Sequence, residues 1–140
     1  MKILKKSISL ILALAVCICF VGCSTGSGYD DYDDFEPAGV YIIDLIGGTK
    51  YPTNIDNPKF AQTMFDAFES LEIDTNTEGK IDASYLYLRF YNKDLSTYII
   101  FTIYENGSCC LGEEFKEFYT VKNGRQAYID LCELYESYEE

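Results

Sequence analysis

The clearest pattern along the chain is a period-two alternation of side chains over residues 85–91, which is typical of a strand with one buried face. Residues 98–104, 108–111 and 118–121 are rich in β-branched and aromatic residues and are separated by turn signals, so each predicts a further strand. Residues 39–46 have the same character and stop at Gly47-Gly48. The pattern therefore predicts about five strands.

A different spacing appears between Phe60 and Leu71, where apolar residues recur every three or four positions and predict an amphipathic helix of about 15 residues. Asn57-Pro58 is a helix start, with Asn57 as the cap, and Pro52 and Pro58 bracket a loop before it. A second helix is predicted after Asn123-Gly124, with one apolar face made by Ala127, Tyr128, Leu131, Leu134 and Tyr135.

The order of these elements is β-α-β-β-β-β-α, and most consecutive strands are joined by short turns. Such an order predicts an α+β fold with a mainly antiparallel sheet and both helices packed on one face. The length from Pro37 onward suits one compact domain, 37–140, with its own core.

Turn positions predict which side chains share a face. A loop centred on Asp94-Leu95 sets Leu86, Leu88 and Phe90 opposite Ile103, Phe101 and Ile99. Asn106-Gly107, taken as a two-residue hairpin, pairs Tyr104 with Cys109 and Ile103 with Cys110. Cys110 would then lie under the helices and Cys109 on the opposite face.

The face away from the helices is the main candidate for function. It gathers five tyrosines and one arginine: Tyr85, Tyr87, Arg89, Tyr91, Tyr98 and Tyr104. Tyrosine combines a flat apolar ring with a polar tip, which suits sugar stacking or protein contact. Two alternatives stay open: tyrosine simply has high strand propensity, or a second copy of the protein covers the face.

The first 22 residues have the organisation of a secretory signal. Lys2, Lys5 and Lys6 precede an apolar run of about 14 residues, shorter than the roughly 20 needed to span a bilayer. The junction Phe20-Val21-Gly22-Cys23 resembles the lipobox of bacterial lipoproteins, with Phe20 where leucine is usual. The resemblance implies cleavage before Cys23, lipidation of that cysteine (diacylglycerol, palmitate) and an address on the outer face of the cytoplasmic membrane.

Residues 23–36 combine a Gly/Ser stretch with the acidic run Tyr29 to Glu36, a composition typical of an unfolded tether. Lipobox, acidic tether and a domain of about 100 residues together resemble the many small lipoproteins of Gram-positive bacteria.

Charge limits the partners. Three of the 11 basic residues lie in the leader and none of the 23 acidic residues does, so the mature chain has eight basic residues against 23 acidic ones, a net charge of −15. This balance argues against nucleic acid and against an anionic membrane surface as partners. A cationic protein, a divalent metal or a neutral sugar is compatible with it.

Three cysteines belong to the domain: Cys109, Cys110 and Cys132. A Cys110–Cys132 disulfide would staple the last helix to the sheet. The absence of any disulfide and a Cys109–Cys132 pair remain as alternatives.

One turn resembles the calcium loop of EF-hand and dockerin proteins, with Asp74, Asn76 and Glu78 at loop positions 1, 3 and 5. It departs from that pattern at position 12, where Tyr85 replaces the bidentate acid, and ordinary turn chemistry produces the same residues.

The chain contains no histidine, which excludes imidazole-based triads and zinc sites. We therefore expect no enzyme activity and no cofactor; a hydrolase built on paired carboxylates stays open as an alternative, because acidic residues are abundant. The expected function is a non-catalytic binding or interaction module. An accessory or inhibitor-like subunit of an exported partner and a calcium-stabilised domain are the alternatives.

Overall fold

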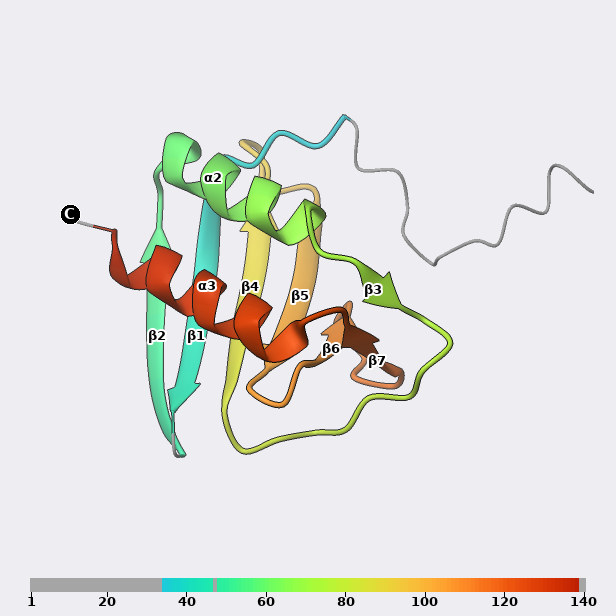
Figure 1. Ribbon diagram of the computed structural model, residues 1–140. Helices are drawn as coiled ribbons and strands as arrows, with labels where there is room; N and C mark the ends of the chain where they lie inside the picture. The colour runs from blue at the N-terminus through green and yellow to red at the C-terminus, as the bar shows by residue number, and fades with distance from the viewer. Residues whose placement is uncertain (1–33, 47, 139–140) are drawn as a thin grey trace, which may run out of the picture. The chain divides into compact units, whose positions relative to one another are not determined.

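A computed structural model describes residues 34–46 and 48–138 (Figure 1) and confirms the α+β class. Its seven strands form one antiparallel sheet in the order β2-β1-β4-β5-β6-β7-β3, with two helices. The strands are β1 (Gly39–Ile46), β2 (Thr49–Ile55), β3 (Ile73–Asp74), β4 (Tyr85–Tyr91), β5 (Tyr98–Tyr104), β6 (Ser108–Leu111) and β7 (Phe118–Val121), and the helices are α2 (Pro58–Glu69) and α3 (Gly124–Glu136).

Both helices lie across the same face of the sheet, as Figure 1 shows. α2 begins as predicted, because the Asn57 side chain accepts a hydrogen bond from the Phe60 amide at 3.1 Å and Pro58 occupies the first turn. Its inner side buries aromatic rings against the central strands. Phe65 meets Phe90 with ring centroids 5.1 Å apart, and Phe68 meets Phe101 at 4.7 Å.

α3 is held at its start by a close approach of two backbones. Gly124 lies against Gly107, so close that a Cβ on Gly124 would come within 2.5 Å of the Gly107 Cα atom. Gly107 itself has φ of +87°, a left-handed conformation that glycine adopts without strain. The β5–β6 turn and the first turn of α3 therefore fit together only because neither residue has a side chain.

Neither helix of the described residues lies on the opposite face of the sheet, and we call it the outer face. Its register positions are Tyr41, Ile43 and Leu45 on β1, Tyr85, Tyr87, Arg89 and Tyr91 on β4, Tyr98, Ile100, Thr102 and Tyr104 on β5, Cys110 on β6 and Phe118 on β7. The β6–β7 loop, residues 112–117, lies over part of it: Cys110 and Thr102 are almost fully buried although both are on the face opposite α2 and α3.

The predicted β4–β5 register is confirmed, with Phe90 opposite Ile99, Leu88 opposite Phe101 and Leu86 opposite Ile103. The β5–β6 register is wrong by one residue, because Ile103 opposes Cys109 and Thr102 opposes Cys110. Glu105, Asn106 and Gly107 form a three-residue loop, in which the Gly107 amide bonds the Tyr104 carbonyl at 2.9 Å. The extra loop residue exchanges the faces of the two cysteines.

Two strands were not expected from the sequence. β2 occupies the predicted loop around Pro52, which pairs with Ile43 of β1. β2 is an edge strand, where proline is tolerated because one side of the strand has no partner to bond. β3, only two residues long, closes the other edge by pairing with β7.

The described part of the chain begins just before the domain predicted from Pro37. Phe35, assigned by sequence to the tether, packs its ring 5.2 Å from that of Phe65. The leader, Cys23 and most of the tether lie outside the described residues. Within residues 34–46 and 48–138, neither helix has the length and apolar character needed to cross a membrane.

Replacing Gly124 with alanine tests the contact between the β5–β6 turn and α3. We expect Gly124→Ala to lower the free energy of unfolding by roughly 1–3 kcal/mol, because the new methyl overlaps the Gly107 backbone and outweighs the better helix propensity of alanine. Urea unfolding followed by circular dichroism measures the change. Gln126→Ala, at an exposed position two residues on, is the matched control and should change stability little.

Candidate functional site

All six residues predicted to share the tyrosine face do lie on the outer face, opposite the helices. They are not equally accessible. Tyr98 is 40% exposed, and Tyr85, Tyr87 and Arg89 are half-buried. Tyr91 and Tyr104 are buried. The accessible part of the predicted site therefore contains four residues rather than six.

Neighbours on the same face account for the burial of Tyr91 and Tyr104. The Tyr91 hydroxyl donates hydrogen bonds to the side chains of Asp56 and Asn54, and its ring lies over Gly39. Burial and the Asp56 carboxylate raise the pKa of Tyr91 to about 12. Tyr104 lies between Tyr85, at 5.8 Å between ring centroids, and Phe118, at 6.1 Å. Tyr91 and Tyr104 therefore pack against neighbouring residues of the domain and are not available to a partner.

Arg89 is at the centre of the accessible part. Its guanidinium carbon lies 4.0 Å from the centroid of the Tyr98 ring, a cation–π arrangement. The Nε atom is buried without a hydrogen-bond partner, and none of the ion pairs found among the described residues involves this arginine. Tyr41 and Ile100 lie directly beside Arg89 on the neighbouring strands. The guanidinium thus keeps unused donor capacity on an aromatic surface.

Sequence reasoning missed the contribution of β1. Tyr41, Ile43 and Leu45 extend the outer face toward β2. They do so because β1 pairs with β4 as well as with β2, the next strand along the chain. The alternation within residues 39–46 contains the signal, since these three residues occupy every second position. Their place beside Arg89 and Tyr87 depends on a non-sequential pairing that no local pattern shows.

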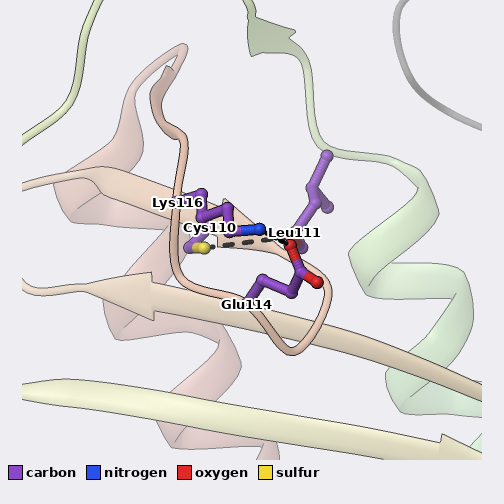
Figure 2. Close-up of polar contacts among 4 residues, drawn as sticks. All are labelled: Cys110, Leu111, Glu114 and Lys116. Atoms are coloured by element: carbon purple, nitrogen blue, oxygen red, sulfur yellow. Dashed lines mark hydrogen bonds and ion pairs between the residues drawn. The ribbon is translucent and has the colours of Figure 1, made fainter.

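The β6–β7 loop supplies an acidic rim. Burial raises the pKa of the Tyr87 hydroxyl, the Arg89 charge lowers it, and the Glu113 carboxylate raises it, so Glu113 lies near Tyr87 on the outer face. In the same loop Lys116 forms an ion pair with Glu114 (Figure 2). The loop leaves the sheet where the Gly112 amide bonds the Ile100 carbonyl at 2.9 Å.

Under this loop the outer face is closely covered. The Thr102 hydroxyl is buried without a hydrogen-bond partner. The Cys110 thiol lies 3.9 Å from the Leu111 carbonyl oxygen, as Figure 2 shows, and a backbone group of Phe115 lies against the same thiol. A loop, and not a ligand surface, therefore occupies this part of the outer face.

The three cysteines of the domain are free thiols. Cys110 lies on the outer face, whereas Cys132 lies on α3, which packs on the opposite face. The sheet separates them, so the expected Cys110–Cys132 disulfide is wrong. The reason is the one-residue register shift at the β5–β6 turn. Cys109 now lies on the helix side, and it too is unpaired.

The turn that resembles a calcium loop is organised by its own hydrogen bonds. Asp74 accepts from the Asn76 amide at 2.9 Å and from the Thr77 hydroxyl at 2.5 Å, and these bonds lower the pKa of the carboxyl group. Asp74 is also part of β3. Within the described residues, no group of three or more Cys, Asp or Glu side chains is placed to hold a metal ion. The contacts of Asp74 are those of an ordinary polar turn.

A buried acid on the helix side is the least expected polar feature. Asp44 on β1 is only 6% exposed, and its Oδ1 atom has no hydrogen-bond partner. Burial and the nearby Glu136 raise the pKa of Asp44. Asp44 is close enough to Tyr128 and Cys132 of α3 to raise the pKa of both side chains. Such a carboxylate costs stability when ionised.

A second concavity, a groove of about 520 Å³ between α2 and α3, lies on the helix side. Its walls are mostly small or aliphatic, among them Ala67, Leu71, Leu131 and Leu134, and an ion pair between Lys122 and Glu72 lies beside it. Ser70, Asn123, Gln126 and Asp130 also line the groove, and the Gln126 amide already donates to Asp130 at 2.8 Å. The outer face has a guanidinium with unused donor capacity beside the exposed Tyr98 ring, and it is the better candidate.

Comparison with known protein families, with curated proteins and with solved structures gives no match to this chain. The outer face itself is therefore the basis for assigning a function. Aromatic rings, one guanidinium and a rim carboxylate favour non-covalent contact with a partner.

Asp44→Asn tests the buried acid. The pKa of Asp44 is higher in the folded than in the unfolded chain, so the folded state binds the proton more tightly and stability falls as pH rises through that raised pKa. We expect Asp44→Asn to raise the free energy of unfolding at pH 7 by on the order of 1 kcal/mol. The gain should shrink toward pH 4. Thermal melts across this range measure it, with the exposed Glu133→Gln on the same helix as control.

Thiol titration tests the cysteines. Burial is the main reason that the pKa of Cys109 is about 12 and that of Cys132 about 11, and it also raises the pKa of Cys110. At pH 8 we expect all three to react with an aromatic disulfide reagent at least about 100-fold more slowly in the native protein than in denaturant. Fewer than three domain thiols in non-reducing denaturant would instead demonstrate a disulfide.

Proposed function

We propose that this protein is a non-catalytic binding or interaction module that contacts an exported protein or a wall glycan through its outer face. The observation that carries the proposal is the state of Arg89. Its guanidinium stacks on Tyr98, and among the described residues its Nε atom has no hydrogen-bond partner and neither helix covers it. The guanidinium enters no ion pair among the described residues, so a partner that offers an acceptor to its terminal nitrogens would gain affinity.

The surroundings of Arg89 fit the same use. The Tyr98 ring lies against the guanidinium, and Tyr41 and Tyr87 occupy neighbouring register positions on the same face. Tyrosine rings bury a large area at low cost in side-chain entropy. Interface hot spots are enriched in tyrosine and arginine, and they cluster at the centre of a contact. The rings also suit stacking on the apolar face of a sugar.

The address of the module belongs to the proposal. The leader and the lipobox-like junction support lipidation of Cys23, which would hold the domain on the outer face of the cytoplasmic membrane. The acidic tether would be repelled by anionic headgroups and would keep the domain off the lipid surface. An exported protein or the wall would then lie within reach.

A second candidate function is an accessory or inhibitor-like subunit of an exported partner. The net charge of −15 on the mature chain favours it, because such a field steers a cationic partner into contact. Salt distinguishes the two candidates. A steered acidic subunit should lose most of its affinity at raised ionic strength, and an aromatic platform should lose little.

A calcium-stabilised domain is the third candidate, with Asp74, Asn76 and Glu78 as ligands. The hydrogen bonds that Asp74 already accepts within its turn weaken it. An unchanged melting temperature in a calcium chelator would exclude it.

Crosslinking in cells tests the outer face. The lipidated full-length protein carries a photo-crosslinking residue at position 43 on the outer face, and mass spectrometry identifies the captured molecule. We expect Tyr41→Ala and Tyr87→Ala each to reduce capture by about tenfold or more, because each removes a ring beside Arg89.

Tyr51→Ala is the matched control, since Tyr51 is 53% exposed but lies on β2 at a register position of the helix face. Circular dichroism melts confirm that each variant is folded. Equal loss of capture in Tyr51→Ala, or no loss in the other two, would contradict the proposed function.

A further inference from the structure

Two loops beside the outer face hold bulky apolar residues in a backbone conformation that such residues rarely adopt. Leu95, between β4 and β5, has φ of +58°, and Phe115, between β6 and β7, has φ of +46°. Asparagine, aspartate and glycine are the usual residues in this left-handed region, where a branched or aromatic side chain is strained. Neither side chain is buried in return: Leu95 is 55% exposed and Phe115 is 45% exposed.

The two loops leave the sheet at the same end of β5. Residues 92–97 join Tyr91 to Tyr98, which oppose each other across the hairpin. The β6–β7 loop departs where the Gly112 amide bonds the carbonyl of Ile100, two residues beyond Tyr98. Tyr98, 40% exposed and stacked under Arg89, therefore lies at the end of the outer face from which both loops project.

Internal hydrogen bonds hold one loop in its strained shape. The Leu95 amide bonds the Asn92 carbonyl at 3.1 Å, and the Asp94 carboxylate accepts from the Ser96 amide at 3.0 Å. In the other loop, the Phe115 backbone lies against the Cys110 thiol and Lys116 pairs with Glu114. The Leu95 loop is thus held by its own hydrogen bonds, and the side chains of both Leu95 and Phe115 remain exposed to solvent. Exposed apolar groups on a strained but ordered backbone are typical of positions retained for contact.

Charge indicates the kind of partner. Glu113 and Glu114 directly precede Phe115 and Glu117 follows it, against one lysine, Lys116, that is already paired. The Leu95 loop, residues 92–97, has no net charge, because Lys93 lies beside Asp94. The mature chain as a whole has a net charge of −15. Such a surface repels an anionic polymer and a second copy of the same acidic chain, and it attracts a basic protein.

We propose that Leu95 and Phe115 are apolar anchors that insert into a basic, exported protein docked on the Tyr98 end of the outer face. This inference depends on the proposed function, because it assigns the partner class and the anchor residues to the same surface. Aromatic and aliphatic anchors flanked by complementary charge are the usual basis of specific protein contact.

The strain provides a test that separates binding from folding. Asparagine is better suited than leucine or phenylalanine to positive φ, so Leu95→Asn and Phe115→Asn should raise the melting temperature of the protein or leave it unchanged. The same changes should weaken binding. Ile81→Asn is the matched control, because Ile81 is 69% exposed in the long connection before β4, and no residue of that connection belongs to the outer face.

The binding measurement uses the lipidated full-length protein in nanodiscs of neutral phosphatidylcholine. Three fluorescent synthetic peptides serve as probes: one alternating lysine and leucine, one alternating lysine and serine, and one alternating glutamate and leucine. Fluorescence anisotropy should detect binding of the lysine–leucine peptide and much weaker binding of the other two. Leu95→Asn and Phe115→Asn should each weaken it at least tenfold, and Ile81→Asn by less than twofold.

Other outcomes overturn the inference. A lower melting temperature in both asparagine variants would show that the two side chains are structural. Equal binding of the glutamate–leucine peptide would remove the charge argument. Two outcomes would show that the anchor assignment is wrong while the proposed function stands. In the first, Tyr41→Ala and Tyr87→Ala weaken binding but the loop variants do not. In the second, an uncharged wall-glycan oligosaccharide binds the outer face and no peptide does. If neither loop nor tyrosine variants affect any bound probe, both fail.

Discussion

Aromatic packing between α2 and the two central strands holds the helix layer to the sheet. Phe65 and Phe68 contact Phe90 and Phe101, and all four rings are almost fully buried. Burial of one such ring contributes roughly 1.5–3 kcal/mol, so this cluster is a large part of the stability of a domain this small. Because the rings occupy one face of β4 and β5, alternation sends every intervening residue to the other face. The composition of the outer face is thus tied to the core.

That constraint leaves the outer face open to the binding role proposed above. A side chain at Tyr87 or Arg89 projects away from the helices, so the choice of residue there is limited by solvent and neighbouring strands and not by the core. Partial cover by the β6–β7 loop leaves one end open, around Tyr98. The domain thus separates a helix face that supplies stability from a sheet face that is free to carry recognition.

Some positions reduce stability without an evident structural return. Asp44 is ionisable and buried under α3, and the Thr102 hydroxyl is buried without a bond. Leu95 and Phe115 hold a backbone conformation that asparagine or glycine would adopt more easily. Proteins tolerate such costs most often where function requires them. For the two loop residues the anchor role proposed above would account for that cost; for Asp44 the structure supplies no such explanation.

Local chemistry alone determined much of this protein. Helix spacing and the Asn57 cap located α2, and alternation with a symmetric loop predicted the β4–β5 register correctly, because both depend on neighbours in the chain.

Tertiary structure decided what those signals could not. The loop at Asn106-Gly107 has three residues and not two, which exchanges the faces of Cys109 and Cys110 and removes the expected disulfide. Sequence cannot distinguish turn lengths that share the same residues. The pairing of β1 with β4 brought Tyr41 beside Arg89, and the close Gly107–Gly124 contact placed α3. Each joins segments far apart in the chain, where the energy depends on packing in space and leaves no periodic trace in the sequence.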